Sequence, residues 1–485
     1  MEDQIKPRSY GFWTALLPVA VLIGMLIYGM LIRPKVFNQE KLSLEFVFLV
    51  ALIVVSSQLL ILKHSWKTIL KSMTDKINTA MPTLLILLAI GLIIGSWIVS
   101  GTIPMFVYYG IKLIHPDYIY LIAFVVPIVF STMTGTSWGS VSTIGVVLIG
   151  VAISIGANLP IAAAAIIGGS FFGDKLSPLS DTTNIAALAT EVSVYDHIKS
   201  MLYTTIPAAL LACVFYFAAG FLFPADQATT NLTEVENTLI DIKRTFNFNI
   251  LLILPPLVIL IGSIRKMPTL PLLVVSSALA VVLGLIFQPF GLEYTAASLV
   301  SGFDVKEMVV VEGNSLNPLV DKLFSRGGMY SLKEPFIISL FVFAFVGALD
   351  RLNAMKVIMD TCLSWIKRAG GTVRAALISS AIVNSLTSNQ YANSFIVGDA
   401  FKAKFDRLKI KRNVLSRSLE DTGTMLESLV PWHTTALYMA STLGVAVADY
   451  WYWQVFSLSN IVIAFLFTFF GIAIFKQTNS DESPK

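Results

Sequence analysis

The sequence predicts an all-α polytopic membrane protein with inverted-topology repeats, about ten transmembrane helices and two re-entrant hairpins. Three observations support this class. Of the 485 residues, 55% are hydrophobic and only 13% are charged, whereas a soluble domain carries roughly 25% charged residues. Apolar runs that approach the roughly 20 residues needed to cross a bilayer recur along the chain. Two polar stretches also interrupt such runs, one in each half of the chain.

The apolar runs give the boundaries of the predicted spans. The first run lacks a small-residue cleavage site, so we expect a retained helix and not a signal peptide. Two of the spans, 161–189 and 414–445, are expected to be broken helices, because each contains a polar stretch with a proline. The spans are predicted at 11–32, 44–62, 81–100, 161–189, 201–223, 247–265, 270–288, 335–349, 414–445 and 454–475.

These spans divide the chain into five parts. Residues 1–80 are expected to hold N-terminal helices and a basic amphipathic segment, 63–79, at the cytoplasmic surface. The parts that follow are a first repeat at 81–223, outer loops and two linking helices at 224–334, a second repeat at 335–475 and a cytoplasmic tail at 476–485.

The distribution of Lys and Arg predicts the orientation. Residues 399–417 hold seven basic residues against two acidic ones, so this loop should be cytoplasmic. Residues 224–246 hold four acids against two bases and should face outward, as should 289–334. Both termini then lie in the cytoplasm and the protein crosses the cell membrane several times. The basic loop 33–43 fits this scheme poorly.

Two segments are predicted to be hairpins. The segment 375–400 has basic flanks on both sides, which a single crossing would place on opposite sides of the membrane. A re-entrant hairpin that turns near Ser385–Asn389 resolves this conflict; one interrupted helix is the alternative. The segment 119–156 can be drawn as a second hairpin, with its turn at Thr134–Ser137 and flanks on the outer side.

The two halves of the chain contain similar polar features. Thr136 and Ser137 are followed by Asp174, and Thr387 and Ser388 are followed by Asp421, with offsets of 251 and 247 residues between the halves. Hairpins that enter from opposite sides are what an inverted repeat predicts.

The stretch GDKLSPLSDTTN at 173–184 predicts a cation site. Pro178 breaks the helix and frees backbone carbonyl groups, and hard cations bind oxygen ligands. A carboxylate at membrane depth is by default a functional candidate. The alternative is a loop outside the membrane in which Asp174 pairs with Lys175. The Na⁺ ligands predicted from this stretch are Asp174, Ser177, Asp181 and Asn184, with Thr182 as a further neutral ligand.

The second polar stretch, SLEDTGTMLESLVPWHTT at 418–435, again combines acids, hydroxyls and a proline. Asp421 and Glu427 are predicted to bind a cation or a proton. His433 could relay protons or bind substrate, although a lone histidine is more often structural.

The hairpin turns should bring further neutral ligands to the same cavity near the bilayer midplane. Many hydroxyl groups in membrane helices only bond to their own backbone or pack between helices, so part of this set is expected to be structural. The predicted neutral ligands at the turns are Thr136, Ser137, Thr387, Ser388 and Asn389.

Several function classes are excluded. The segment GGSFFGDK has the glycine spacing of a phosphate loop, but Asp174 stands where its lysine belongs. The four histidines are scattered, the two cysteines suggest no metal site, and no basic domain is present for nucleic acid. We therefore expect no enzyme activity and no cofactor.

Three stretches resemble recurring segments of the NhaC family of bacterial Na⁺/H⁺ antiporters: TGTSWGS at 134–140, GDKLSPLSDTTNIAA at 173–187 and EDTGTMLESLVPWHT at 420–434. The resemblance covers roughly residues 80–475. It implies an inverted-repeat secondary transporter of the ion-transporter superfamily type, in a family with members that exchange malate and lactate or are linked to amino acids. Glu427 and His433 stand where small polar residues and an asparagine are expected, which leaves room for a larger solute.

The predicted function is exchange of Na⁺ for H⁺ by alternating access. A partly dehydrated carboxylate can bind either a proton or Na⁺, with little chance of holding both. The alternative is a Na⁺- or H⁺-coupled carrier of a small organic acid or amino acid, and a gated channel is a third hypothesis. The expected partners are Na⁺, H⁺ and the lipid bilayer; a small carboxylate or amino acid and a homodimer stay open.

Overall fold

The computed structural model describes residues 10–225, 232–265, 267–305, 318–363 and 368–476. Within these ranges the chain is helical, apart from turns and one isolated β-bridge between Ile410 and Lys476. The predicted all-α class is therefore confirmed for the described residues. Most of the predicted tail, residues 477–485, lies outside them.

Nine helical segments in the described part of the chain are long and apolar enough to cross a membrane. Two bent pairs, Asn237–Thr245 with Ile250–Gly262 (98°) and Val447–Trp453 with Val455–Phe470 (55°), raise the number to 11 if each counts as one span. The nine segments hold α1 (Phe12–Leu26), α3 (Leu44–Ile61), α4 (Trp66–Val99), α6 (Ile119–Thr134), α7 (Ser137–Ser140) with α8 (Val146–Ser154), α9 (Leu159–Leu176), α11 (Val194–Leu222), α14 (Thr269–Phe287) and α18 (Lys333–Arg351).

One predicted boundary differs from the structure, and one predicted hairpin has its turn where the sequence predicts it. The basic segment 63–79 is not a separate helix, because α4 runs unbroken for 34 residues from Trp66, after the Ser65 cap, and passes through Pro82. The predicted hairpin 119–156 does turn at Gly135, which has a left-handed φ of 68°. Each of its arms is nevertheless long enough to be a candidate span, so its re-entry remains a prediction.

The described residues form further α-helices, two of which, α20 and α21, are 19 and 18 residues long. They are α2 (Arg33–Val36), α5 (Thr102–Leu113), α10 (Asp181–Ala189), α12 (Leu232–Thr245), α13 (Leu254–Ile264), α15 (Leu292–Val300), α17 (Pro318–Phe324), α19 (Ala354–Leu363), α20 (Ala369–Thr387), α21 (Gln390–Arg407), α22 (Arg412–Ser418), α23 (Thr434–Leu443), α24 (Val447–Tyr450) and α25 (Val455–Phe470).

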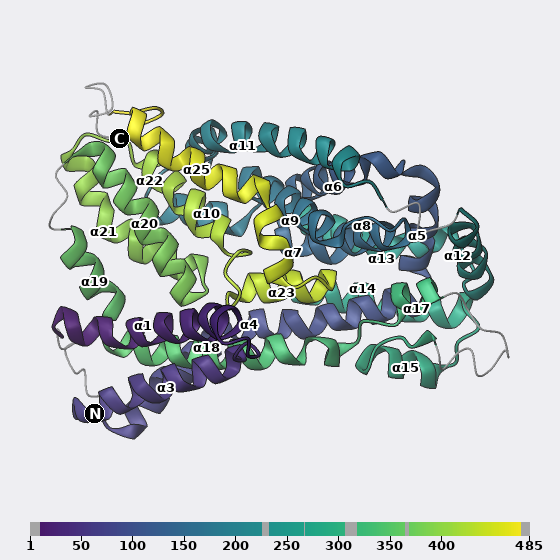
Figure 1. Cartoon of the computed structure of the whole chain (residues 1–485), viewed down its shortest axis with the longest axis horizontal. Coiled ribbons are helices and arrows are strands. Elements are labelled where there is room, and N and C mark those ends of the chain that lie inside the picture. Colours follow the sequence, from purple (N-terminus) through teal and green to yellow (C-terminus); the bar gives the residue numbers. More distant parts are fainter. Residues whose placement is uncertain (1–9, 226–231, 266, 306–317, 364–367, 477–485) are drawn as a thin grey trace.

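The helices form two layers along the long axis of the molecule. Figure 1 shows α1, α3, α4 and α18 in the lower layer and α6, α9, α11 and α25 in the upper one. The helices α20 and α21 lie side by side at the left end, whereas α12, α15 and α17 lie at the right end. The basic and the acidic loops are thus at opposite ends of the molecule, as the charge distribution predicts for the two sides of a membrane.

Small residues allow α6 and α9 to pack closely. A Cβ atom on Gly169 would lie 2.0 Å from the Phe124 carbonyl oxygen, and one on Gly173 would lie 2.5 Å from the Thr132 amide nitrogen. Ser131 Oγ also donates a hydrogen bond of 2.6 Å to the Ser170 carbonyl. Close backbone approach of this kind is how helices associate inside membranes. It fixes Asp174, near the end of α9, relative to the turn after α6.

Gly169→Ala should therefore destabilise the protein by about 1–3 kcal/mol, the usual cost of overpacking, and lower its melting temperature in detergent. Gly24→Ala is the matched control, because a Cβ on Gly24 in α1 meets nothing within 4 Å. Equal melting temperatures for the two variants would contradict this account of the α6–α9 contact.

Helix boundaries recur at one spacing in the two halves of the chain. The helices α6 and α20 end at Thr134 and Thr387, which are 253 residues apart. The same spacing of 253 separates the first residues of α9 and α22, of α10 and α23, and of α11 and α24: Leu159 and Arg412, Asp181 and Thr434, and Val194 and Val447.

Candidate functional site

The turn after α6 and the turn after α20 have the same backbone conformation. Gly135 and Ser388 follow the ends of α6 and α20 in the left-handed conformation, with φ values of 68° and 48°. Thr136 and Asn389 come next as extended N-caps, and their side chains accept hydrogen bonds from the Gly139 and Ala392 amides at 3.2 and 3.0 Å. A non-glycine residue with positive φ is uncommon, so the conformation of Ser388 is held by its surroundings.

The two predicted broken helices also share a design. The helix α9 ends at Leu176, Pro178 follows, and Ser180 caps α10 by accepting from the Thr183 amide at 3.3 Å. In the second half a π-helical stretch at Leu419–Thr424 precedes Pro431, and His433 caps α23. The prolines lack the amide that helix continuation requires.

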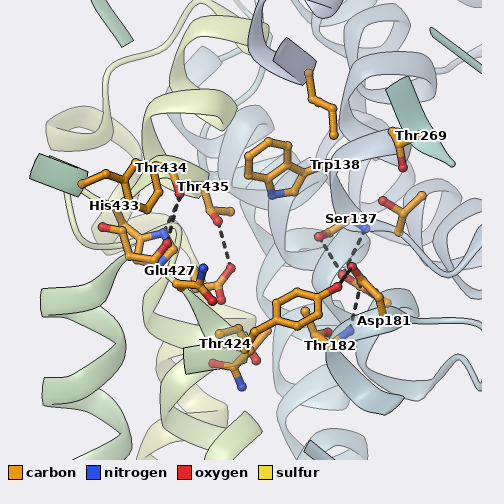
Figure 2. Close-up of a pocket in the computed structure, with 18 residues that line it drawn as sticks. Ser137, Trp138, Asp181, Thr182, Thr269, Thr424, Glu427, His433, Thr434 and Thr435 are labelled. Atoms are coloured by element: carbon orange, nitrogen blue, oxygen red, sulfur yellow. Dashed lines mark hydrogen bonds between the residues drawn. The ribbon is translucent and has the colours of Figure 1, made fainter. Parts of the chain in front are cut away.

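The turns and the breaks border one cavity of about 180 Å³. Figure 2 shows Ser137, Asp181 and Thr182 on one side of it and Glu427, His433 and Thr435 on the other, with Trp138 between them. The helices α4, α14 and α18 close the cavity with Ile86, Thr269 and Phe343. The remaining residues that line it are Thr136, Asp174, Ser388, Asn389, Gln390, Tyr391, Thr424 and Thr434.

Asp174 lines the cavity with one carboxylate oxygen unsatisfied. Ser137 donates to Asp174 Oδ2 from its backbone amide at 3.1 Å and from its hydroxyl at 2.7 Å. Asp174 Oδ1 is buried and has no hydrogen-bond partner among the described residues. Since a buried ionised oxygen without a partner is costly, this atom is suited to a proton or a cation.

Glu427 is held by a chain of hydrogen bonds. Asn384 Nδ2 donates to its Oε1 at 3.1 Å, and Thr435 Oγ1 donates to its Oε2 at 2.9 Å. The Thr435 amide donates to His433 Nδ1 at 3.1 Å, and His433 Nε2 lies 3.4 Å from Asn384 Oδ1. These contacts place the proton of a neutral His433 ring on Nε2 and orient Asn384 toward Glu427.

Asp181 and Thr182 lie at the exposed side of the cavity. Asp181 is exposed, whereas Asp174 is only 5% exposed. Tyr391 donates its hydroxyl to Asp181 Oδ2 at 2.5 Å, and the Thr182 amide donates to Asp181 Oδ1 at 3.0 Å. The two aspartates of the first polar stretch therefore face the cavity from different depths.

Three predicted neutral ligands do not line the cavity. Ser177 donates to the Thr132 carbonyl at 2.9 Å, and Asn184 donates to the Pro178 carbonyl at 2.9 Å. Thr387 donates to the Asn389 carbonyl at 3.3 Å. These hydrogen bonds hold the backbone of the turns and of the helix breaks in place, which is the structural role expected for some of the predicted neutral ligands. The predicted four-residue Na⁺ set thus keeps only Asp174 and Asp181 at the cavity.

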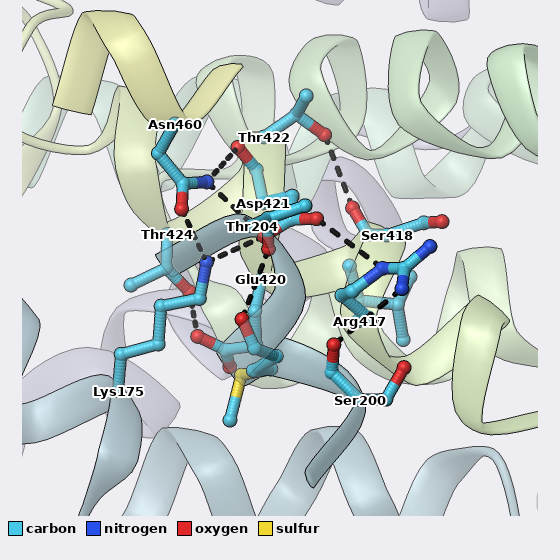
Figure 3. Close-up of polar contacts among 12 residues, drawn as sticks. Lys175, Ser200, Thr204, Arg417, Ser418, Glu420, Asp421, Thr422, Thr424 and Asn460 are labelled. Carbon is cyan, nitrogen blue, oxygen red and sulfur yellow. Dashed lines mark hydrogen bonds and ion pairs between the residues drawn. The ribbon is translucent and has the colours of Figure 1, made fainter. Parts of the chain in front are cut away.

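Asp421 also lies away from the cavity, in a buried ionic cluster (Figure 3). Lys175 Nζ is 2.6 Å from Asp421 Oδ1, and Arg417 Nε is 3.6 Å from Asp421 Oδ2. Thr204 and Asn460 donate to the same Oδ1 at 2.8 and 3.1 Å. Lys175 therefore pairs with Asp421 from the other half of the chain, and not with its neighbour Asp174 as the loop alternative required.

The spacing of 253 residues pairs Asp174 with Glu427 and Pro178 with Pro431. The hydrogen bond from Ser131 to the Ser170 carbonyl likewise has a counterpart 253 residues later, from Asn384 to the Gly423 carbonyl at 2.8 Å. The offset of 247 residues predicts instead that Asp174 corresponds to Asp421, and the structure does not support this register, because the two carboxylates lie in different sites. The prolines were the signal that could have given the correct register.

The sequence predicts no role for Tyr391, Asn384 or Asn460, and for Lys175 it offers only the pairing with Asp174. Tyr391 contacts Asp181, Asn384 contacts Glu427, and Lys175 and Asn460 hold Asp421. They act through tertiary contacts between segments far apart in the sequence, so no local pattern indicates them.

A cluster of ion pairs at the surface joins the turn after α10 to α21 and α22. Lys402 of α21 donates to Glu191 at 2.9 Å, and Arg412 of α22 also pairs with Glu191. Hydrogen bonds from Lys402 and Arg412 lower the pKa of the Glu191 carboxyl. This cluster fixes the second half of the first broken helix against α21 and α22.

The described residues contain no group of three His, Cys, Asp or Glu side chains that could hold a metal ion. The cavity lining does include the carboxylates of Asp174 and Asp181 and the neutral oxygens of Thr136 and Ser137, and oxygen atoms are the ligands that hard cations bind.

The chain is similar to known transporters over most of its length. The profile of the Na⁺/H⁺ antiporter family matches residues 169–472. An uncharacterized Na⁺/H⁺ antiporter of Haemophilus influenzae is 37% identical over 86% of this chain and 88% of its own length. The Na⁺/H⁺ antiporter NhaC of Bacillus subtilis is 34% identical over 79% and 83%. The malate-2H⁺/Na⁺-lactate antiporter of the same species is 30% identical over 86% and 87%.

Proposed function

The chain belongs to the Na⁺/H⁺ antiporter family, a family of transporters, and we propose that it exchanges Na⁺ for H⁺ across the cell membrane by alternating access. The observation that carries this proposal is the state of Asp174. Its Oδ1 atom is buried beside the cavity without a hydrogen-bond partner among the described residues, and its Oδ2 atom is oriented by Ser137.

Asp174 is proposed to bind a proton and Na⁺ in turn. Leaving the carboxylate both ionised and dry is unfavourable, so either a proton or a cation must neutralise it. Na⁺ would complete its shell with neutral oxygens from Thr136, Ser137 and water. Asp181, at the exposed side, would attract cations into the cavity.

Alternating access is supported by the repeated geometry. The two turns, the two broken helices and the pair Asp174 and Glu427 all recur at the spacing of 253 residues, which is what two repeats would produce. We propose that these repeats are inverted and that both termini are cytoplasmic, because the basic and acidic loops lie at opposite ends.

The proposal is tested with purified protein in liposomes that contain a pH-sensitive dye and carry a preset pH gradient. Addition of NaCl should dissipate the gradient, whereas choline chloride should not, and no organic solute should be required. Protein that is monodisperse in detergent yet gives no Na⁺-driven proton flux would refute Na⁺/H⁺ exchange.

Coupled transport of an organic solute is the second candidate, and the size of the cavity favours it. A cavity of about 180 Å³ exceeds what one ion needs, since a single water needs roughly 10–15 Å³. In the same assay, proton flux that appears only when a small carboxylate or amino acid is added would favour this candidate.

A further inference from the structure

The cavity offers binding groups for both signs of charge. Three carboxylates line it, from Asp174, Asp181 and Glu427, and its lining includes no Lys or Arg. The starts of α10, α21 and α23 also border it, and a helix start carries a partial positive charge. A solute with only a carboxylate would meet three negative groups without a compensating base.

The start of α21 is suited to a carboxylate. This helix is 18 residues long; its first amide groups have no acceptor inside the helix, and Asn389 accepts from one of them, that of Ala392. A second observation points to a ligand at the same place: Ser388 lines the cavity, is 4% exposed, and its hydroxyl oxygen has no hydrogen-bond partner among the described residues.

The side chain of Glu427, which lines the same cavity, is suited to an ammonium group. Each of its oxygens accepts one hydrogen bond, and an ionised carboxylate oxygen can accept about two. Trp138 also borders the cavity and is stacked on Tyr438, with ring centroids 4.1 Å apart. A fixed indole ring attracts organic cations.

We propose that the cavity binds an α-amino acid, with the solute carboxylate at Ser388 and the start of α21 and its ammonium group at Glu427. The solute occupies the side of the cavity formed by the second half of the chain. The side formed by Asp174 and Ser137 stays available for Na⁺ or H⁺. The inference rests on the second candidate under the proposed function, because it makes the amino acid the organic solute that this transporter couples to Na⁺ or H⁺.

The test measures binding to the purified protein in NaCl by ligand-induced thermal stabilisation. Two amino acids of different length are each compared with the analogues that lack one charge. L-alanine is compared with ethylamine and propionate, and L-lysine with cadaverine and 6-aminohexanoate. At least one amino acid should bind about tenfold or more tightly than both of its analogues, because each analogue leaves one set of polar groups unpaired.

Two variants locate the site. Ser388→Ala and Glu427→Gln should each weaken binding of that amino acid about tenfold. Ser394→Ala is the matched control: Ser394, in α21, is like Ser388 a buried hydroxyl without a described partner, but it does not line the cavity. It should bind like the wild type.

The outcomes separate the two proposals. If neither amino acid binds more tightly than its analogues, or if Ser394→Ala weakens binding as much as Ser388→Ala, the amino-acid site is refuted. Na⁺-driven proton flux in the same preparation without amino acid would then still support the proposed exchange. Tight amino-acid binding without such flux would instead refute simple Na⁺/H⁺ exchange.

Discussion

Asp174→Asn should reduce Na⁺-driven proton flux in proteoliposomes to the level of protein-free vesicles. Asparagine preserves the shape of the side chain and can still accept the hydrogen bonds from Ser137 to its oxygen. It carries no negative charge and takes up no proton, so the exchange of one cation for the other is lost. The protein should remain folded, because the substitution removes a buried charge whose Oδ1 atom has no described partner.

Asp449→Asn is the control for this experiment. Asp449 is an exposed carboxylate that does not line the cavity, and its variant should exchange like the wild type. Normal flux in Asp174→Asn would remove Asp174 from the mechanism.

Asp181→Asn should retain measurable proton flux at high Na⁺, because Asp181 is exposed and is expected to attract cations more than to bind them tightly.

Asp421→Asn should destabilise the protein by about 3–5 kcal/mol, the range for a buried ion pair that loses one partner. Lys175 is fully buried, and its ammonium nitrogen lies 2.6 Å from Asp421. Without the carboxylate this charge, and that of Arg417 at 3.6 Å, would lack compensation. Stabilities of folded domains are only about 5–15 kcal/mol, so most of the variant should be lost as aggregate during detergent extraction.

The double variant Lys175→Gln/Asp421→Asn distinguishes charge compensation from other roles of Asp421. Two neutral amides can still hydrogen-bond across the two halves of the chain, so the double variant should recover much of the lost melting temperature. The double-mutant cycle then gives a large coupling energy. A double variant no more stable than Asp421→Asn would show that the Lys175 contact is not what Asp421 supplies.

The sequence was sufficient for the helical class, for the turn positions and for the broken helices, because these depend on local signals. Pro178 and the runs of hydroxyl side chains mark the first break directly. The sequence predicts Glu427 and Asp174 as functional carboxylates inside apolar runs, and the structure places both at one cavity.

The pairing of the halves could not be predicted in detail, because it depends on contacts between distant segments. The residues next to Asp421 in the sequence are polar, like those next to residues that line the cavity. Lys175, 246 residues away in the sequence, nevertheless pairs with Asp421 outside the cavity. Ser177 and Asn184 have suitable oxygens, but nearby backbone carbonyls accept their hydrogen bonds. The sequence does not show which backbone carbonyl accepts the hydrogen bond of a given side chain.

The most direct test of competition between Na⁺ and H⁺ at Asp174 is the Na⁺ affinity of the purified protein, measured with radiolabelled Na⁺ over a series of pH values. Because a protonated carboxylate cannot hold the ion, the apparent dissociation constant should rise about tenfold for each unit of pH below the point where the proton begins to occupy the site. Asp174→Asn should abolish this dependence together with tight binding. A wild-type affinity that is independent of pH, or unchanged Na⁺ binding in Asp174→Asn, would contradict the account.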